Sequence, residues 1–349
     1  MHNYISGIQQ IGIGVKDVQE CMLLYKDLFG MEVLVFDDTS DANLMTKYTG
    51  GKVYNRRAVL TLNMQGGGGF EIWQFKNRKP SEAFSAPVYG DIGIYAPKLK
   101  CNDVLGAYKY FLSKKEIVVS ELQKDPKDDF TFYVSDKNKN VFQVVWGNHW
   151  FNQTRKKYVG GVTGSVIGVT DMDQAIHFYK IFGLEEIVYD VTGEYTSGAD
   201  KSFARYRKVL LQKHPSGKGA FGKLFGSMEI ELVQCLNRKP DKIYANRFWG
   251  DCGFIHLCFD VVNMCALKKH AENEGFNFTV DSCDSFAMDN ASGRFCYLED
   301  PDGTLIELVE THKVPILKKW GIYLDLRKRS LEKPLPDWMV KMLSLSKVK

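Results

Sequence analysis

Residues 70–80 read FEIWQFKNRKP, and residues 230–240 read IELVQCLNRKP. The two stretches share six of eleven residues at an offset of 160 positions, which is closer than composition alone produces. Self-similarity at a fixed offset is typical of a duplicated architecture, and a missed repeat misassigns the whole fold. The flanking sequence should therefore show the same duplication.

The similarity extends over both halves of the chain. Residues 13–17 (IGVKD) match residues 167–171 (IGVTD), and further pairs follow downstream. These further pairs are residues 90–94 with 255–259 and residues 133–136 with 297–300. The second half is therefore a repeat of the first along its whole length.

Each quarter of the chain has the same order of patterns. In the first quarter, Ile11, Ile13 and Val15 alternate as in a half-buried strand, and residues 18–29 then carry apolar side chains at helical spacing. Three further strand-like segments follow. Gly30 and Gly183 are placed to end their helices as C′ glycines. The sequence predicts an α+β fold of four βαβββ modules that form two tandem barrels.

We expect these modules to divide the chain into two domains, a linker and a tail. Residues 5–149 form the N-terminal domain, residues 150–161 an exposed linker, and residues 162–312 the C-terminal domain. Residues 313–349 form a tail with ten Lys or Arg and three Asp or Glu residues. We expect this basic tail to pack across the second barrel or a partner subunit.

Composition excludes several classes of function. The 349 residues carry a net charge of +4 on 46 basic and 42 acidic side chains, which is too balanced for a nucleic-acid-binding protein. No signal peptide and no long apolar run are present, so we expect a cytoplasmic protein that does not bind membranes. The eight cysteines form no Cys-x-x-Cys pair, and we expect mostly buried free thiols.

Three polar residues interrupt strands that are otherwise apolar. Glu231, His256 and Glu307 each stand between apolar neighbours, where an unpaired charge costs several kcal/mol unless a cation or strong donor offsets it. Two carboxylates and one imidazole inside a barrel would form an open divalent-metal site. Alternatively, His256 is a core histidine and the glutamates form structural ion pairs with Arg205, Arg207 or Arg294.

Two of these residues lie in motifs that resemble a known superfamily. Residues 253–257 (GFIHL) and 300–308 (DPDGTLIEL) are similar to the second module of the glyoxalase I, bleomycin-resistance and extradiol-dioxygenase proteins, the vicinal oxygen chelate superfamily. In that family, metal ligands come from the first and last strands of paired modules. The resemblance therefore implies Glu231, His256 and Glu307 as ligands of a divalent metal: Zn, Ni, Mn, Co or Fe.

The other positions of the family pattern are less complete. Gly164 stands where the family usually has His or Gln, and glycine offers no side-chain ligand. In the N-terminal half, our alignment places four residues at the ligand positions: Gln10, Glu71, Asp91 and Gln143. We expect this half to be degenerate and structural, with a metal site only in the C-terminal barrel.

The expected ligand set favours one type of reaction over another. Oxygenases of this superfamily need two histidines and one carboxylate, whereas this set has one histidine and two carboxylates. We therefore expect a lyase or isomerase that acts next to a carbonyl of a small molecule, with Glu307 or Glu231 as general base. The alternatives are a metal-free protein that binds a small molecule and, less favoured, an extradiol-type dioxygenase. The chain is expected to be a monomer or a homodimer.

Two glycine-rich segments carry weaker signals. Residues 66–69 precede a strand rather than a helix, so we expect a flexible hairpin and not a phosphate-binding loop. Residues 213–226 form an insertion before Glu231, which is either a lid over the C-terminal barrel or a surface loop.

Overall fold

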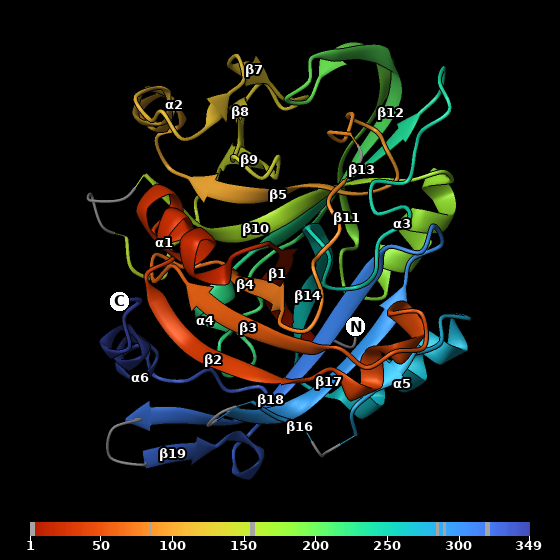
Figure 1. The fold of residues 1–349 in the computed structure, drawn as a ribbon. Coiled ribbons are helices and arrows are strands. Elements are labelled where there is room, and N and C mark those ends of the chain that lie inside the picture. Colours follow the sequence, from red (N-terminus) through yellow and green to blue (C-terminus); the bar gives the residue numbers. More distant parts are fainter. Residues whose placement is uncertain (1–3, 84, 154–157, 284–285, 289–290, 318–321) are drawn as a thin grey trace.

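The computed structural model describes residues 4–83, 85–153, 158–283, 286–288, 291–317 and 322–349. These residues form two large curled sheets with short helices (Figure 1). The expected α+β architecture of four βαβββ modules is confirmed. Part of the expected linker, residues 154–157, lies outside the described residues, as do residues 318–321 of the tail.

The first sheet, called sheet A here, has ten strands in the order β15-β17-β18-β14-β1-β4-β3-β2, with β16 and β19 beside β17 and β18. Its strands from the first module are β1 (Ile5–Gly14), β2 (Val33–Asp41), β3 (Asn55–Leu62) and β4 (Gly69–Phe75). Its strands from the fourth module and the tail are β14 (Gly253–Val261), β15 (Val280–Asp281), β16 (Phe286–Met288), β17 (Ala291–Glu299), β18 (Leu305–Leu317) and β19 (Ile322–Asp325).

The second sheet, called sheet B, has nine strands in the order β11-β12-β13-β10-β5-β9-β8-β6, with β7 beside β8. The second module supplies β5 (Gly93–Cys101), β6 (Val118–Val119), β7 (Gln123–Lys124), β8 (Phe130–Ser135) and β9 (Val141–Trp146). The third module supplies β10 (Val159–Gly168), β11 (Glu186–Ser197), β12 (Ser202–Lys213) and β13 (Met228–Cys235).

Each sheet therefore combines one module from each half of the chain. In sheet A, β1 pairs antiparallel with β14, and in sheet B, β10 pairs with β5. Figure 1 shows β1 of the first module beside the teal strand β14 of the fourth. We expected modules one and two to share a barrel and modules three and four to share the other, and this pairing is wrong. Sequence repetition reveals equivalent modules but not which of them share an edge.

The helices and the core lie between the two sheets. The main helices are α1 (Val18–Phe29), α2 (Val104–Leu112), α3 (Met172–Lys180) and α5 (Met264–Asn273). Side chains of α1 link the sheets: Phe29 packs on Phe70 of β4 and Phe142 of β9. As predicted, Gly30 caps α1 in the left-handed conformation, with φ +67°, where glycine avoids the strain of a Cβ.

The central strand β1 is buried along its whole length, whereas we expected a half-buried strand. Ile11 and Ile13 belong to the core between the sheets, while Gln10 lines a cavity on the concave side of sheet A. Both faces of the strand are therefore covered. The amide of Gln10 is buried and lines the cavity.

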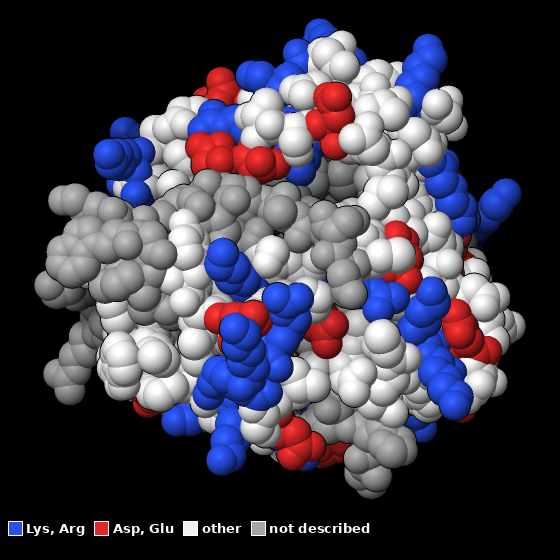
Figure 2. Space-filling view, turned by 90° about the horizontal axis from the view of Figure 1, so that it is seen from below, with Lys and Arg blue, Asp and Glu red and all other residues white. Residues whose placement is uncertain are grey.

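The tail packs against sheet A rather than against a separate C-terminal barrel. It contains the 3-10 helices η3 (Leu326–Lys328) and η4 (Met342–Leu345) and the short helix α6 (Asp337–Lys341). Its last residues lie beside β2, where Leu34 N donates to Ser346 O at 2.8 Å and Val348 N donates to Glu32 O at 2.9 Å. On the face seen in Figure 2, basic side chains lie among acidic ones.

The insertion before β13 closes one end of sheet A. It carries α4 (Gly222–Phe225), which contacts β1. The glycine-rich loop at residues 66–69 is buried, and Gly67 N donates to Leu224 O at 2.8 Å. This loop is therefore buried and hydrogen-bonded, whereas we expected a flexible hairpin. Within the described residues, no helix combines the length and apolar character needed to cross a bilayer.

Candidate metal centre

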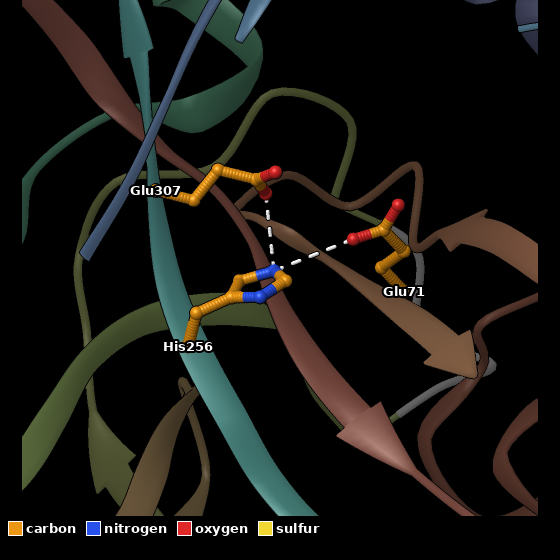
Figure 3. Close-up of side chains that lie close together, drawn as sticks. All are labelled: Glu71, His256 and Glu307. Atoms are coloured by element: carbon orange, nitrogen blue, oxygen red, sulfur yellow. Dashed lines mark ion pairs between the residues drawn. The ribbon is translucent and has the colours of Figure 1, made fainter. Parts of the chain in front are cut away.

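Three ionisable side chains converge on the concave side of sheet A. They are Glu71 of β4, His256 of β14 and Glu307 of β18, all buried (Figure 3). His256 Nε2 lies 3.0 Å from Glu307 Oε2 and 3.3 Å from Glu71 Oε2. The three ligand atoms lie within 4.8 Å of one another, which is the arrangement that one cation needs.

Gln10 of β1 adds a fourth polar group to this cluster. Its Nε2 donates to Glu71 Oε2 at 2.9 Å and to Glu307 Oε2 at 3.2 Å. Its Oε1 is buried and has no hydrogen-bond partner among the described residues. Because the two ends of a glutamine amide have nearly the same shape, a half-turn would aim Oε1 at the cluster as a potential ligand.

Strand order explains why these four residues meet. The strands β18, β14, β1 and β4 are consecutive neighbours in sheet A. Gly12 of β1 pairs with both His256 and Glu71, and Cys258, two residues after His256, pairs with Glu307. Side chains in register on adjacent strands share one face of the sheet. The fold therefore places one candidate ligand on each of four strands.

The electrostatics of the cluster are those of buried charges in close contact. Burial raises the pKa of Glu71, and the nearby charge of Glu307 raises it further. Burial lowers the pKa of His256, but the two glutamates outweigh this effect and raise it to about 9. Burial also raises the pKa of Glu307, but His256 and Tyr297 outweigh it, so the net shift is downward. The metal-free cluster thus contains a protonated imidazole between carboxylates.

Tyr297 of β17 contacts the other nitrogen of the imidazole. Its hydroxyl lies 3.2 Å from His256 Nδ1. A contact of this kind fixes the orientation of a metal-binding histidine and leaves Nε2 free to face the cation. Among the described residues, His256 is the ion-pair partner of both glutamates, and neither has a lysine or arginine partner. The cluster therefore fits a divalent cation in charge and in donor type.

Glu231, which we expected beside His256 and Glu307, lies in sheet B. Its Oε2 is 2.8 Å from Lys98 Nζ, and its Oε1 accepts a hydrogen bond from Tyr89 at 3.0 Å. Lys98 also pairs with Glu229 at 3.0 Å. Burial raises the pKa of Glu231, but Lys98 and Lys208 outweigh it, so the pKa is lowered. Glu231 is therefore paired as in our structural alternative, although with Lys98 and not with an arginine.

The structure also separates the positions that we assigned to an N-terminal site. Gln10 and Glu71 join the cluster in sheet A, whereas Gln143 donates to Thr131 at 3.1 Å in sheet B. Asp91 pairs with Arg238 at 2.7 Å, just as Asp251 pairs with Arg78 at 2.6 Å. Asp91 is thus the counterpart of Asp251, not of His256.

These paired arginines come from the repeated Asn-Arg-Lys-Pro motif, at residues 77–80 and 237–240. Each arginine joins its own module to the module that shares its sheet. The strands β5 and β14 each begin at a glycine with positive φ, Gly93 (+112°) and Gly253 (+111°). Counted from these glycines, Ala96 in β5 occupies the position that His256 occupies in β14. Sheet B therefore has alanine at that position and glycine at position 164.

A cavity of about 320 Å³ adjoins the cluster. Gln10, Glu71 and Glu307 line it, together with aromatic side chains and Arg56. The aromatic lining residues are Phe36, Trp73, Trp249, Phe295 and Tyr297. A concave, mostly apolar pocket with a few convergent polar groups is typical of a small-molecule site.

Part of the chain matches the sequence model of a known family. The family model of the Glyoxalase/Bleomycin resistance protein/Dioxygenase superfamily matches residues 165–315. Over these residues the chain is similar to that superfamily, the vicinal oxygen chelate proteins. No curated protein matches its sequence. The family model covers the third and fourth modules, while the first module reaches the same fold with a more divergent sequence.

Several solved structures share the fold over most of the chain. A Bacillus subtilis protein described as a candidate dioxygenase has a TM-score of 0.56 at 11% identity, covering 88% of this chain and 86% of its own. Maize glyoxalase I has a TM-score of 0.51 at 11% identity, covering 87% of this chain and 92% of its own. A point variant of the maize enzyme has a TM-score of 0.53 at 12% identity, with the same coverage.

Proposed function

We propose that this protein is a divalent-metal-dependent, glyoxalase-like lyase or isomerase that acts next to a carbonyl of a small molecule. The observation that carries the proposal is the meeting of Glu71, His256 and Glu307 in one cavity. Gln10 is the fourth candidate ligand. Two buried carboxylates with one imidazole between them leave a net negative charge, which a divalent cation would offset.

The cation, when bound, would supply a Lewis acid that polarises a carbonyl oxygen. The protein's own residues would move the proton. Glu71 and Glu307 lie on either side of His256 Nε2 and both line the cavity, so a carbon held there faces a carboxylate oxygen. Glu307, as expected from the sequence, and Glu71, in place of Glu231, are therefore the candidate general bases.

Other residues would hold the substrate and exclude water. Trp73 and Trp249 pack edge to face at 4.6 Å between ring centres and form one wall of the cavity. Arg56 lies 4.9 Å over the Trp73 ring, is almost fully buried, and pairs with Asp38 at 2.5 Å. Because Asp38 already offsets the charge of this guanidinium, its remaining N–H groups favour a neutral, oxygen-bearing substrate over an anionic one.

The donor set argues against an oxygenase. The iron oxygenases of this type use two histidines and one carboxylate, and this cluster has one histidine. The metal-free alternative has one observation in its favour, because a protonated His256 would by itself offset part of the charge of the two glutamates. A metal-free protein of this kind would bind a small molecule in the cavity without changing it.

Deuterium exchange tests the proposed proton transfer without knowledge of the product. The protein is stripped with a chelator, reloaded with Zn, Ni, Co or Mn, and mixed with α-oxo aldehydes and α-hydroxy ketones in D₂O. We expect exchange at the carbon next to the carbonyl, seen by NMR, and a loss of at least ~100-fold in Glu307→Gln or Glu71→Gln. Glu231→Gln is the matched control and should exchange normally. Equal exchange in all variants, or exchange in the stripped protein, would overturn the proposal.

A further inference from the structure

A second, apolar cavity adjoins the cavity at the candidate metal centre. It measures about 100 Å³, and its walls include Leu60, Leu62, Phe225, Val314 and Leu343. Ten of its fourteen lining residues are apolar, and none carries a charge. Gln9, Phe36 and Val309 line both cavities, so the two spaces share a boundary.

The position of Gln9 at this boundary follows from an irregularity in β1. The pairing of β1 with β14 shifts register between Ile8 and Gln10. A bulge of this kind turns a side chain away from the strict alternation of a strand. Gln9 and Gln10 consequently line the same cavity, although they are consecutive residues. Gln10 faces the ligand cluster, and Gln9 stands where the polar cavity meets the apolar one.

The apolar cavity is closed by two segments that lie outside the four modules' shared pattern. Phe221, Leu224 and Phe225 come from the insertion before β13, and Leu343 comes from the tail. These segments hold each other in place: Leu335 N donates to Ala220 O at 2.9 Å, and Lys223 pairs with Asp337 at 2.9 Å. We expected the insertion to be either a lid over the C-terminal barrel or a surface loop. In the structure it covers sheet A together with the tail.

The backbone of β1 allows the insertion at residues 213–226 to approach closely. A Cβ on Gly7 of β1 would lie 2.5 Å from Phe225 Cβ, so only glycine lets the phenylalanine reach the strand. The insertion also has buried side chains, among them Leu224 and Phe225. Apart from Gln9, Ser292 and Thr311, the lining offers no side-chain hydrogen-bonding group, so the cavity favours an apolar ligand.

We propose that the apolar cavity binds an alkyl or aryl arm of the substrate while the oxygen-bearing end lies at Gln10, Glu71, His256 and Glu307. This inference rests on the proposed function and names the substrate class: a carbonyl compound with an apolar substituent. A cavity of about 150 Å³ lined by apolar side chains holds a benzene molecule. On that scale this cavity takes an arm of about four carbon atoms.

Straight-chain hydroxamic acids test the inference directly. They present two adjacent oxygens to a metal and carry an alkyl arm of chosen length. Their dissociation constants are measured by calorimetry on cobalt-loaded protein, from the two-carbon to the eight-carbon acid. We expect affinity to rise roughly threefold to fourfold per methylene and then level off once the cavity is filled.

Two variants locate the effect. Ser292→Leu places a side chain in the apolar cavity and should remove the chain-length dependence, while the two-carbon acid and the metal still bind. Leu343→Gln should weaken the longer acids about tenfold. Leu345→Gln is its matched control, because Leu345 lies on the same turn, is 70% exposed and does not line the cavity.

The outcomes separate this inference from the proposed function. If metal and the two-carbon acid bind but affinity is independent of chain length, the apolar cavity is a packing void and the inference fails alone. If Ser292→Leu keeps the wild-type chain-length dependence, the arm lies elsewhere and the inference also fails. If no metal and no hydroxamate bind, the proposed function fails and the inference fails with it.

Discussion

The imidazole of His256 fills the space that a Cβ on Gly12 would need. An added Cβ would lie 2.4 Å from His256 Cε1 and 2.6 Å from Nε2. By the module repeat, the corresponding pair in sheet B is Val166 and Ala96, both buried in one cluster. In sheet A the larger residue of the pair is on β14 and the smaller is on β1. In sheet B the larger residue is on β10 and the smaller is on β5. Gly12 therefore belongs to the candidate metal centre although it has no ligand atom.

The first prediction concerns Gly12→Ala. The methyl group would displace the imidazole, because the neighbouring backbone of β1 and β14 cannot separate without breaking their pairing. We expect a loss of about 2 kcal/mol in the free energy of unfolding and at least a tenfold loss of metal affinity. Urea unfolding and metal titration measure the two effects.

His256→Ala in the Gly12→Ala background provides the control. Removing the imidazole makes room for the methyl group, so the double variant should lose little more stability than His256→Ala alone. Strictly additive losses in the double variant would show that Gly12 does not act through His256.

The second prediction concerns the buried ion pairs of sheet B. Lys98→Met leaves Glu229 and Glu231 without their shared cation, and removal of one partner from a buried pair costs about 3 to 5 kcal/mol. We expect a loss of this size in urea unfolding, with metal binding unchanged.

A compensating variant checks the cause of that loss. Lys98→Met with both glutamates changed to glutamine removes all three charges and should recover at least half of the lost stability. A single Lys98→Met variant that loses less than about 1 kcal/mol would contradict a structural role for these ion pairs.

The third prediction concerns the pH dependence of stability. Burial raises the pKa of Asp260 to about 7; hydrogen bonds from Ser6 and Gln9 oppose this shift, and Glu310 adds to it. In the unfolded chain the carboxyl titrates near pH 4. Its contribution to stability is therefore fully present below about pH 4 and is lost as the pH rises to about 7.

Asp260→Asn removes this titration. We expect the variant to be more stable than wild type by up to about 4 kcal/mol at pH 8, with the difference shrinking toward pH 4. Guanidinium unfolding at several pH values measures the difference. A variant that is less stable than wild type at pH 8 would show that the ionised carboxylate stabilises the fold.

The module fold was readable from sequence because it depends on local patterns. The repeat at residues 70–80 and 230–240 shows duplication, and the glycine after α1 has the predicted left-handed conformation. Which modules share a sheet depends instead on contacts between strands far apart in the chain. Ile5 pairs with Val261, for example, and no local pattern encodes such a partner.

Only part of the candidate site could be predicted, because its residues come from modules that are far apart in the sequence. His256 and Glu307 were singled out correctly as neighbours, whereas Glu231 was assigned to them because it lies in the same half of the sequence. One signal pointed to the true grouping. Gln10 offers a ligand atom where Gly164 offers none, so the two halves hold complementary parts of one candidate ligand set.

Metal content tests the central claim most directly. Protein purified without chelator is analysed by plasma mass spectrometry, for wild type and for Glu71→Ala, His256→Ala, Glu307→Ala and Glu231→Ala. We predict about one equivalent of a divalent transition metal in wild type and in Glu231→Ala, and its loss in the other three variants. A wild-type protein that is metal-free and cannot be loaded, or a metal that is lost with Glu231 but kept without Glu71, would contradict the account.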